Sequence, residues 1–201
     1  MPDSTPAIDQ AWINQIIHAI DQNLRPQDTA FQAQLRLALM DAHQVEGCPR
    51  ASQLTAASKP GVVRRLTLLE NHSRNYDLLL LVWPPGYRGE IHDHAGQMGL
   101  EIVLDGQLVF ETFAVSPATA DTAMTLLLLN EARQRPGDAA HFGGTQHAHR
   151  CINPSESQAS LSLHIYSRHV SQCRFFFQDS MGNWQSGTCD LVAESPANLS
   201  R

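Results

Sequence analysis

The sequence predicts a mainly β domain in which N-terminal helices cover one end of a small barrel. Two patterns predict this fold class. Apolar residues between positions 7 and 44 recur at the three- and four-residue spacing of amphipathic helices. After Gly61, β-rich segments follow one another at intervals of about ten residues, which is typical of a sandwich or barrel. With 201 residues, the chain is long enough for one domain with a sizeable core.

Residues 1–60 are expected to form the helical cap as part of the same domain. Two sets of apolar residues mark two helices: Ile8, Trp12, Ile16, Ile17 and Ile20, then Phe31, Leu35, Leu37, Leu39 and Met40. Asp28 and Thr29 are suited to cap the start of the second helix. Between 46 and 61 the composition predicts a loop or a short helix. A role of the helices in protein interaction is the alternative to simple coverage of the barrel.

The barrel is expected to span residues 61–190, followed by a loose tail at 191–201. Strands are expected near residues 62–69, 76–83, 98–104, 107–115, 123–129, 147–152, 159–167 and 172–178. The apolar run 78–82 suits a strand that is buried on both faces, and the Pro-Pro-Gly after Trp83 ends it. The Asp-Gly pair within 104–107 predicts a hairpin turn between two of these strands.

Composition argues against several classes of partner. A net charge of −6 with only 14 Lys and Arg disfavours nucleic acid or a membrane surface and favours a small-molecule ligand. The four cysteines are widely spaced and are expected to be free thiols: Cys48, Cys151, Cys173 and Cys189. We expect a cytoplasmic protein, because no leader pattern is visible and no apolar run approaches the roughly 20 residues that span a bilayer. The sequence leaves a homo-oligomer open.

A pair of histidines provides the first candidate metal ligands. On a strand, side chains at i and i+2 share a face, so His92 and His94 would converge while Asp93 points away. Their spacing from Gly86 resembles the first motif of the cupin superfamily, which holds metals inside small β-barrels. In that motif a glutamate follows, but the nearest carboxylate here, Glu101, lies seven residues beyond His94. A third ligand is therefore expected from elsewhere.

A second histidine cluster offers this third ligand. His149 and Asn153 match the close of the second cupin motif. His147 and His141 lie nearby and compete for the role. Because His147 and His149 would share one face of a strand, spacing alone leaves the choice open.

A third pattern is the alternation of polar and apolar residues at 160–166. Ser162, His164 and Tyr166 would lie on one face of a strand, opposite the leucines and isoleucine between them. One interpretation is an edge strand whose polar face meets solvent. The other is a hydrogen-bonded row beside a polar cavity, in which Ser162 orients His164 and His164 orients the Tyr166 hydroxyl.

Together these motifs resemble the cysteine dioxygenase family, the thiol dioxygenase branch of the cupins, which includes 3-mercaptopropionate dioxygenase. The likeness covers roughly residues 63–177 and rests on HDH at 92–94, HR at 149–150 and SLHIYS at 162–167. The fifteen-residue step from His149 to His164 also matches. The resemblance implies a single cupin barrel, that is, a double-stranded β-helix or jelly roll.

The resemblance also implies roles for individual residues. His92, His94 and His149 would hold one mononuclear Fe(II), with O2 as the co-substrate. Ser162, His164 and Tyr166 would form the catalytic row. Arg65 aligns with the position at which cysteine dioxygenases have an arginine for the substrate carboxylate and 3-mercaptopropionate enzymes a glutamine, and Tyr166 would also contact the substrate. Arg64 is the adjacent alternative; whichever arginine points outward would be a surface charge.

Two positions depart from the family pattern. Gly99 stands where animal enzymes have a cysteine cross-linked to the strand tyrosine, so Tyr166 would act as a free phenol. Ser167, Arg168 and His169 stand where many relatives have Ser-Pro-Pro, which could admit a substrate with a second carboxylate.

The resemblance thus implies an enzyme that inserts both atoms of O2 into the sulfur of a small thiol carboxylate. L-cysteine, converted to cysteine sulfinate, is the leading substrate because of Arg65. The alternatives are 3-mercaptopropionate, mercaptosuccinate and cysteamine. A metal-binding cupin that only binds a small ligand is the non-enzyme alternative, and a cupin isomerase or hydrolase is the other enzyme class.

Overall fold

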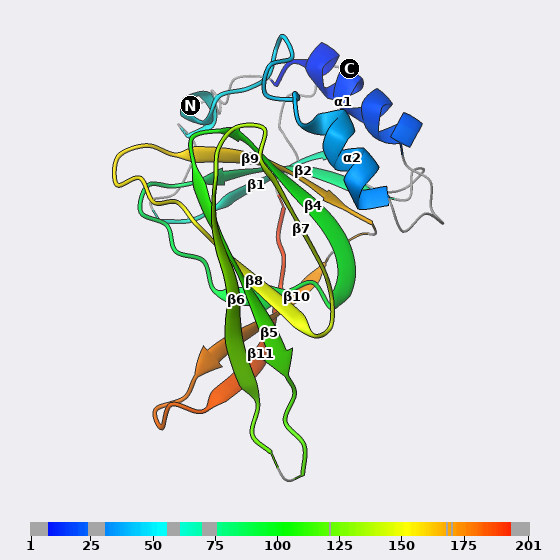
Figure 1. The fold of residues 1–201 in the computed structure, drawn as a ribbon. Coiled ribbons are helices and arrows are strands. Elements are labelled where there is room, and N and C mark those ends of the chain that lie inside the picture. The colour runs from blue at the N-terminus through cyan, green and yellow to red at the C-terminus, as the bar shows by residue number, and fades with distance from the viewer. Residues whose placement is uncertain are drawn as a thin grey trace.

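Two antiparallel sheets face one another, and three helices cover the outer side of the first sheet (Figure 1). The structure, a computed structural model, describes residues 8–23, 31–55, 61–69, 76–120, 122–167, 169 and 171–193. The predicted fold class, a mainly β jelly-roll barrel with an N-terminal helical part, is confirmed.

The helices are α1 (Gln10–Asn23), α2 (Phe31–Leu39) and the short α3 (Ala51–Leu54). The apolar residues of α1 fall on one face because they recur every three or four positions, and this face is buried: Trp12, Ile13, Ile16 and Ile20. The indole N–H of Trp12 donates to the carbonyl of Ala42 over 3.1 Å. The predicted capping residues Asp28 and Thr29 lie outside the described residues.

The first sheet has the strand order β1-β2-β9-β4-β7. Its strands are β1 (Arg64–Leu69), β2 (Asp77–Trp83), β9 (Ser160–Tyr166), β4 (Gly96–Asp105) and β7 (Ala139–Gly144). β2 is buried along almost its whole length on both faces, as its apolar run predicts. β9 lies in the middle of the sheet and every one of its residues is buried, so the edge-strand interpretation is wrong.

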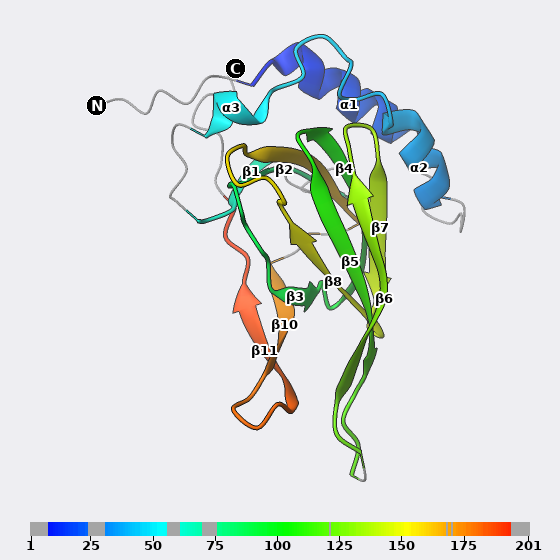
Figure 2. The ribbon, with the colours of Figure 1, turned by 60° about the vertical axis from the view of Figure 1, so that its left-hand side comes forward.

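The second sheet has the strand order β11-β10-β3-β8-β5-β6. Its strands are β11 (Trp184–Asp190), β10 (Gln172–Gln178), β3 (Ile91–Asp93), β8 (His147–Ile152), β5 (Leu108–Ser116) and β6 (Thr125–Gln134). The hairpins β5–β6 and β10–β11 project from the end of the barrel that lies away from the helices (Figure 2). The sequence did not predict β3, β7 or β11.

The Asp-Gly turn between β4 and β5 is not a hairpin turn. β4 pairs with β7 and β9, whereas β5 pairs with β6 and β8, so the predicted hairpin is wrong. The turn instead carries the chain from one sheet to the other. Gly106 makes this possible with φ of +78°, and a Cβ atom there would lie 2.5 Å from the Ser160 hydroxyl oxygen.

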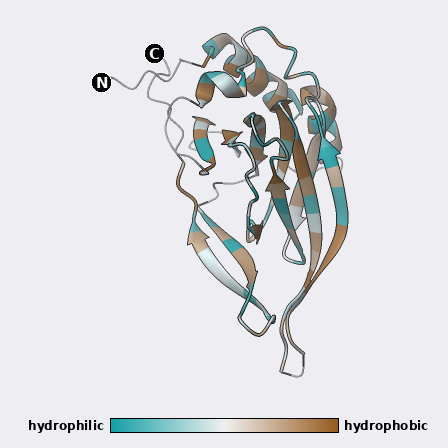
Figure 3. Cartoon of the chain, turned by 90° about the vertical axis from the view of Figure 1, so that its left-hand side faces the viewer, coloured by the Kyte–Doolittle hydropathy of each residue, from teal (hydrophilic) through white to brown (hydrophobic). Residues whose placement is uncertain are grey.

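The main apolar core lies between the helices and the outer face of the first sheet. Hydrophobic segments appear on both the helices and the strands (Figure 3). On β9 the apolar side chains point to this core: Leu161, Leu163 and Ile165. The alternate residue Tyr166 belongs to a second cluster inside the barrel, with Trp83 and Phe142. The period of two in β9 therefore gives one apolar face and one face inside the barrel.

The predicted domain organisation, with a cap at 1–60, a barrel at 61–190 and a tail at 191–201, stays a prediction. The described strands begin at Arg64 and end at Asp190. None of the described helices has the length and apolar character needed to cross a membrane. The cytoplasmic location expected from the sequence also stays a prediction.

Candidate metal centre and its cavity

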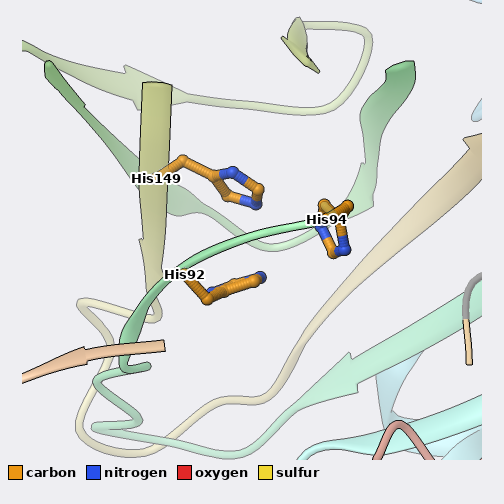
Figure 4. Close-up of side chains that lie close together, drawn as sticks. All are labelled: His92, His94 and His149. Carbon is orange, nitrogen blue, oxygen red and sulfur yellow. The ribbon is translucent and has the colours of Figure 1, made fainter. Parts of the chain in front are cut away.

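Three histidines from two neighbouring strands come together inside the barrel. His92 lies on β3, His94 directly follows this strand, and His149 lies on β8. His92 and His149 are direct partners in the antiparallel ladder, so the strand register brings their side chains together. One ring nitrogen from each of the three histidines lies within 4.8 Å of the other two. Figure 4 shows the three rings facing a shared space.

The hydrogen bonding of His92 and His94 suits metal ligands. His92 Nδ1 lies 3.0 Å from the carbonyl oxygen of Glu90, which can only accept a hydrogen bond. Nδ1 therefore carries the hydrogen, and the lone pair of His92 is on Nε2. His94 Nδ1 is buried and has no hydrogen-bond partner among the described residues. A buried nitrogen of this kind needs a partner, and a metal ion would provide one.

His149 is held between two phenylalanine rings. The Phe110 ring stacks on one side with a centroid distance of 5.1 Å, and Phe142 stacks at 4.7 Å. Burial and the neighbouring imidazoles hold the pKa of both His94 and His149 well below the usual value. These rings are therefore neutral at physiological pH, which is the form that binds a metal.

The competing histidines lie apart from this cluster. His141 and His147 are both exposed, whereas His149 is buried. His147 begins β8 and pairs with Ala114, toward the end of β5 from which the hairpin projects. The shared strand face of His147 and His149 thus continues beyond the barrel, and only His149 reaches the interior.

Glu101, the first carboxylate after His94 in the sequence, is not part of the cluster either. It is fully buried and lies opposite His164 in the β4–β9 ladder. Its Oε2 accepts a hydrogen bond from the Cys151 thiol over 3.2 Å and lies 3.7 Å from His164 Nε2. Burial raises the pKa of Glu101 to about 7.

A row of hydrogen bonds runs along the inner face of β9. Ser162 Oγ lies 2.8 Å from His164 Nε2, and His164 Nδ1 lies 3.3 Å from the Tyr166 hydroxyl. At the other end, Trp83 Nε1 donates to Ser162 Oγ over 2.8 Å. The row predicted from the sequence is thus formed, and Trp83 extends it by one residue that the sequence did not single out.

Trp83 gives this row a direction. An indole N–H can only donate, so the Ser162 oxygen accepts from Trp83. Its other described partner is His164 Nε2, to which the buried hydroxyl therefore donates its own hydrogen. His164 is neutral, because burial lowers its pKa to about 3, and so its single hydrogen is on Nδ1 and points to Tyr166. The hydroxyl hydrogen of Tyr166 is then left for a group in the cavity.

The three histidines line one cavity of about 320 Å³ together with Trp83, His164 and Tyr166 of this row. Burial raises the pKa of Tyr166, so the side chain stays a phenol at physiological pH. The cavity wall includes the side chains of Arg65, Trp83, His92, His94, His149 and Tyr166. The cavity is thus large enough for a small ligand beside the three imidazoles.

Arg65 and Arg64 point to opposite sides of β1. Arg65 lines the cavity, and its positive charge helps to lower the pKa of His164. Arg64 is buried on the other side, where its guanidinium donates to the carbonyl of Leu54 at the end of α3 over 3.1 Å. The expectation that the second arginine is a surface charge is therefore wrong. Consecutive side chains on a strand point to opposite faces, so Arg64 and Arg65 lie on different sides of the sheet.

Gly99 has no room for a side chain. It lies opposite Tyr166 in the β4–β9 ladder. A Cβ atom at this position would overlap the Phe142 ring and lie 3.0 Å from the carbonyl oxygen of Ile165. The same phenylalanine that stacks on His149 therefore occupies the space beside Tyr166.

The region near Ser167 and His169 borders a second, smaller cavity of about 130 Å³. This cavity shares Arg65 and Tyr166 with the first. His169 Nδ1 lies 2.8 Å from a carboxylate oxygen of the buried Asp77. Arg168, which the sequence also placed here, lies outside the described residues.

Comparison with known proteins agrees with these features. The family model "Cysteine dioxygenase type I" matches residues 7–179. Cysteine dioxygenase type 1 of Rattus norvegicus is 28% identical over 111 residues, which cover 55% of this chain and 54% of that protein. The protein of the same name from Danio rerio is 26% identical over the same shares. The match thus spans about half the length of these curated relatives.

Solved structures resemble the chain only distantly. Hydroquinone 1,2-dioxygenase PnpCD has a TM-score of 0.43 and 15% identity, covering 58% of this chain and 69% of that chain. This level of similarity is too low to support an inference about function. The family model, in contrast, matches far more than half of the sequence. The chain therefore belongs to the cysteine dioxygenase type I family.

Proposed function

We propose that the protein is a non-haem Fe(II) thiol dioxygenase that converts a small thiol carboxylate, with L-cysteine as the leading candidate, to its sulfinate. One observation carries this proposal: three neutral imidazoles, an arginine and a directed tyrosine hydroxyl line the same cavity. In the overall reaction, R–S⁻ and O2 combine to R–SO2⁻, so both oxygen atoms end on sulfur.

The three histidines fit a divalent metal ion. His92 presents Nε2, His94 has a buried nitrogen without a partner, and His149 is neutral and fixed by aromatic stacking. Three neutral donors leave the full charge of the metal uncompensated, which favours an anionic ligand such as a thiolate. When bound, Fe(II) would supply the redox chemistry that lets O2 react with sulfur.

Arg65 would bind the substrate carboxylate. Its planar guanidinium can form two parallel hydrogen bonds to a carboxylate, and it faces the cavity that contains the three histidines. The positive charge of Arg65, together with that of a bound metal ion, would attract a thiolate carboxylate to the cavity. This arrangement orients the sulfur toward the histidines when the carboxylate is on Arg65.

Tyr166 would donate its free hydroxyl hydrogen within the cavity. The chain of donors from Trp83 through Ser162 and His164 fixes the phenolic oxygen as an acceptor on one side. Its hydrogen is then available to an oxygen of the substrate or of O2. Because the hydrogen bond to His164 determines this orientation, the row positions the donor before the substrate arrives.

The proposal is tested by oxygen uptake of the iron-loaded protein with four thiols: L-cysteine, 3-mercaptopropionate, mercaptosuccinate and cysteamine. We expect turnover of L-cysteine, and mass spectrometry of the sulfinate made under ¹⁸O2 should find two labelled oxygen atoms. Cysteamine lacks the carboxylate and should turn over much more slowly. If the protein binds iron tightly but none of the thiols drives oxygen uptake, the ligand-binding alternative replaces the enzyme.

Arg65→Gln tests the carboxylate site directly. Loss of a charged hydrogen bond of about 1.5–3 kcal/mol should raise the KM for L-cysteine about 10- to 150-fold, with unchanged iron content. Arg64→Gln is the matched control on the opposite face of β1 and should leave this KM unchanged. Equal KM changes in the two variants would contradict the assignment to Arg65.

Mercaptosuccinate is the second candidate substrate, and the smaller cavity favours it. This cavity adjoins Arg65 and contains His169 and Thr67, so a second carboxylate has space and donors there. The Asp77 carboxylate already binds His169, and its negative charge makes this cavity less attractive to a second carboxylate. A kcat/KM for mercaptosuccinate above that for L-cysteine, reversed by His169→Ala, would favour this substrate.

A further inference from the structure

Two cysteines face one another across the β10–β11 hairpin at the cavity. Cys173 and Cys189 are direct partners in the antiparallel ladder, and both line the larger cavity. Cys173 is buried, whereas Cys189 is partly exposed. Both are free thiols. The proposed dioxygenase reaction uses neither of them.

The Cα spacing of this pair falls within the range found in disulfides, and the two thiols are close enough to hydrogen-bond. The N–H of Leu191 donates to the carbonyl of Ser171 over 2.8 Å, so these two residues form a hydrogen-bonded pair. Hydrogen-bonded and non-hydrogen-bonded pairs alternate in an antiparallel ladder, and Cys173 with Cys189 lies two positions along. Their Cα atoms are therefore about 5.5 Å apart, within the range of about 4.4–6.8 Å found in disulfides.

The two thiols differ in how they would react. Burial, together with a hydrogen bond to the Cys189 thiol, raises the pKa of Cys173 to about 12. Cys173 is thus a poor first nucleophile. The partly exposed Cys189 can meet an incoming molecule first, and Cys173 lies directly behind it.

Charges near the pair favour an incoming molecule that carries a carboxylate. Arg65 acts electrostatically on Cys173, with the opposite influence of Glu90 weaker. The same arginine faces the cavity in which both thiols lie. A small disulfide with carboxylates, such as L-cystine, therefore has both a cationic anchor and an accessible thiol.

We propose that Cys173 and Cys189 form a two-cysteine redox site that reduces a small carboxylate-bearing disulfide in the cavity. The Cys189 thiolate attacks one sulfur of RSSR, which forms a mixed disulfide and releases RS⁻. The Cys173 thiol then gives up its proton as its sulfur attacks the Cys189 sulfur, and the displaced second RS⁻ takes up a proton. The two cysteines lose two electrons and two protons, and RSSR becomes two RSH.

This site is independent of the metal centre in its chemistry, but it would supply a thiol to the same cavity. The second attack joins β10 to β11, so the oxidised protein has a covalently closed hairpin beside β3. An added dithiol such as dithiothreitol should reopen it by the same exchange reaction.

The test uses the reduced full-length protein, incubated with L-cystine without oxygen, followed by alkylation of free thiols and mass spectrometry. We expect the number of free thiols to fall from four to two, with no cysteine adduct left on the protein and two cysteines released per chain. Peptide mapping should find Cys173 linked to Cys189. Dithiothreitol should restore all four thiols.

Variants separate the two steps. Cys173→Ser should stop at a stable mixed disulfide on Cys189, and Cys189→Ser should not react in the cavity at all. Cys48→Ser is the matched control, because Cys48 lies outside the cavity, and it should still lose two thiols. Cys173→Ala and Cys189→Ala replace the serine variants if those do not fold.

Two results would overturn the proposal: a persistent mixed disulfide on the wild-type protein with Cys173 free, or reaction confined to Cys48 or Cys151. Both readouts count thiols and adducts and need neither iron nor oxygen. If the protein is not a dioxygenase, the thiol test still applies. If the two cysteines do not react with L-cystine, the dioxygenase proposal is unaffected.

Discussion

The core beneath the helices and the interior of the barrel lie on opposite faces of the same sheet, yet they bury different kinds of side chain. The helix-covered core consists mainly of apolar residues and aromatic rings, such as Trp12 and Leu163, and the one buried guanidinium described on this side, that of Arg64, is bonded to the Leu54 carbonyl. The interior buries His149, His164 and Glu101 beside its aromatic residues. This difference indicates that the first region supplies stability and that the second holds the chemistry.

The interior tolerates polar groups that a dry core would exclude. A buried polar atom without a hydrogen bond costs on the order of 1–3 kcal/mol. Glu101 Oε1 and His94 Nδ1 are two such atoms among the described residues. Substitutions in the helix-covered core should therefore change stability alone, whereas those in the interior should change binding, pH dependence or turnover.

The largest expected effect is on stability, in Trp12→Ala. Removing this fully buried ring should lower the free energy of unfolding by about 3–5 kcal/mol, because it leaves a cavity and an unpaired Ala42 carbonyl. Chemical denaturation measures the change. Gln15→Ala, an exposed position on the same helix, is the control and should stay within about 0.5 kcal/mol of wild type. A changed metal affinity in folded Trp12→Ala would contradict the separation of the two regions.

Glu101→Gln should remove a pH dependence of stability. The pKa of Glu101 is about 7 in the folded protein and near its ordinary value of 4.5 when unfolded. The protonated carboxyl is therefore favoured by folding, so its contribution is complete below about pH 4.5 and is lost as pH rises through 7. Relative to Glu101→Gln, the wild type should lose stability on the order of 3 kcal/mol over this window. Parallel stability curves of the two proteins would show that Glu101 does not titrate there.

His149→Ala should weaken metal binding. We expect a more than about 100-fold loss of affinity, which exceeds the loss usually caused by removing an outer partner of a ligand. Isothermal titration with Fe(II) without oxygen measures it. His147→Ala is the matched control two residues away, on the exposed end of β8, and should bind like wild type. The opposite pattern would make His147 the ligand.

Trp83→Phe should have the smallest effect, and on turnover. Without the indole N–H, the Ser162 hydroxyl is no longer directed toward His164, and we expect kcat to fall about five- to tenfold, or about 1–1.5 kcal/mol. Iron content should not change. Ser162→Ala breaks the same row, so the double variant should be no slower than the slower single variant. Fully additive losses would show that Trp83 acts through packing rather than through the row.

Much of the fold could be predicted because its strands carry strong local patterns. The alternation on β9 and the apolar run of β2 predicted both strands, and the alternation also separated the two faces of β9. β3 has only three residues, β7 ends in two glycines, and β11 is polar and half exposed. These strands form because neighbours pair with them, and pairing is not visible in a short segment.

In the candidate site, too, some residues could be predicted from local patterns and others could not. His92, His94 and the β9 row follow from strand alternation, and the family resemblance selected His149 over His147. Strand alternation also separates Arg65 from Arg64 once β1 is placed. Trp83, Phe110 and Phe142 could not be assigned, because they reach the site from different strands through the register of the sheets. The Asp-Gly turn misled for a related reason: its local geometry does not specify which sheet the next strand joins.

The overlap of Phe142 with a Cβ atom at position 99 couples two parts of this site. Gly99→Cys would make its Cβ atom overlap the Phe142 ring, so this ring has to shift before a cysteine there can approach Tyr166. The same ring stacks on His149, so the shift would also change the packing of a candidate metal ligand.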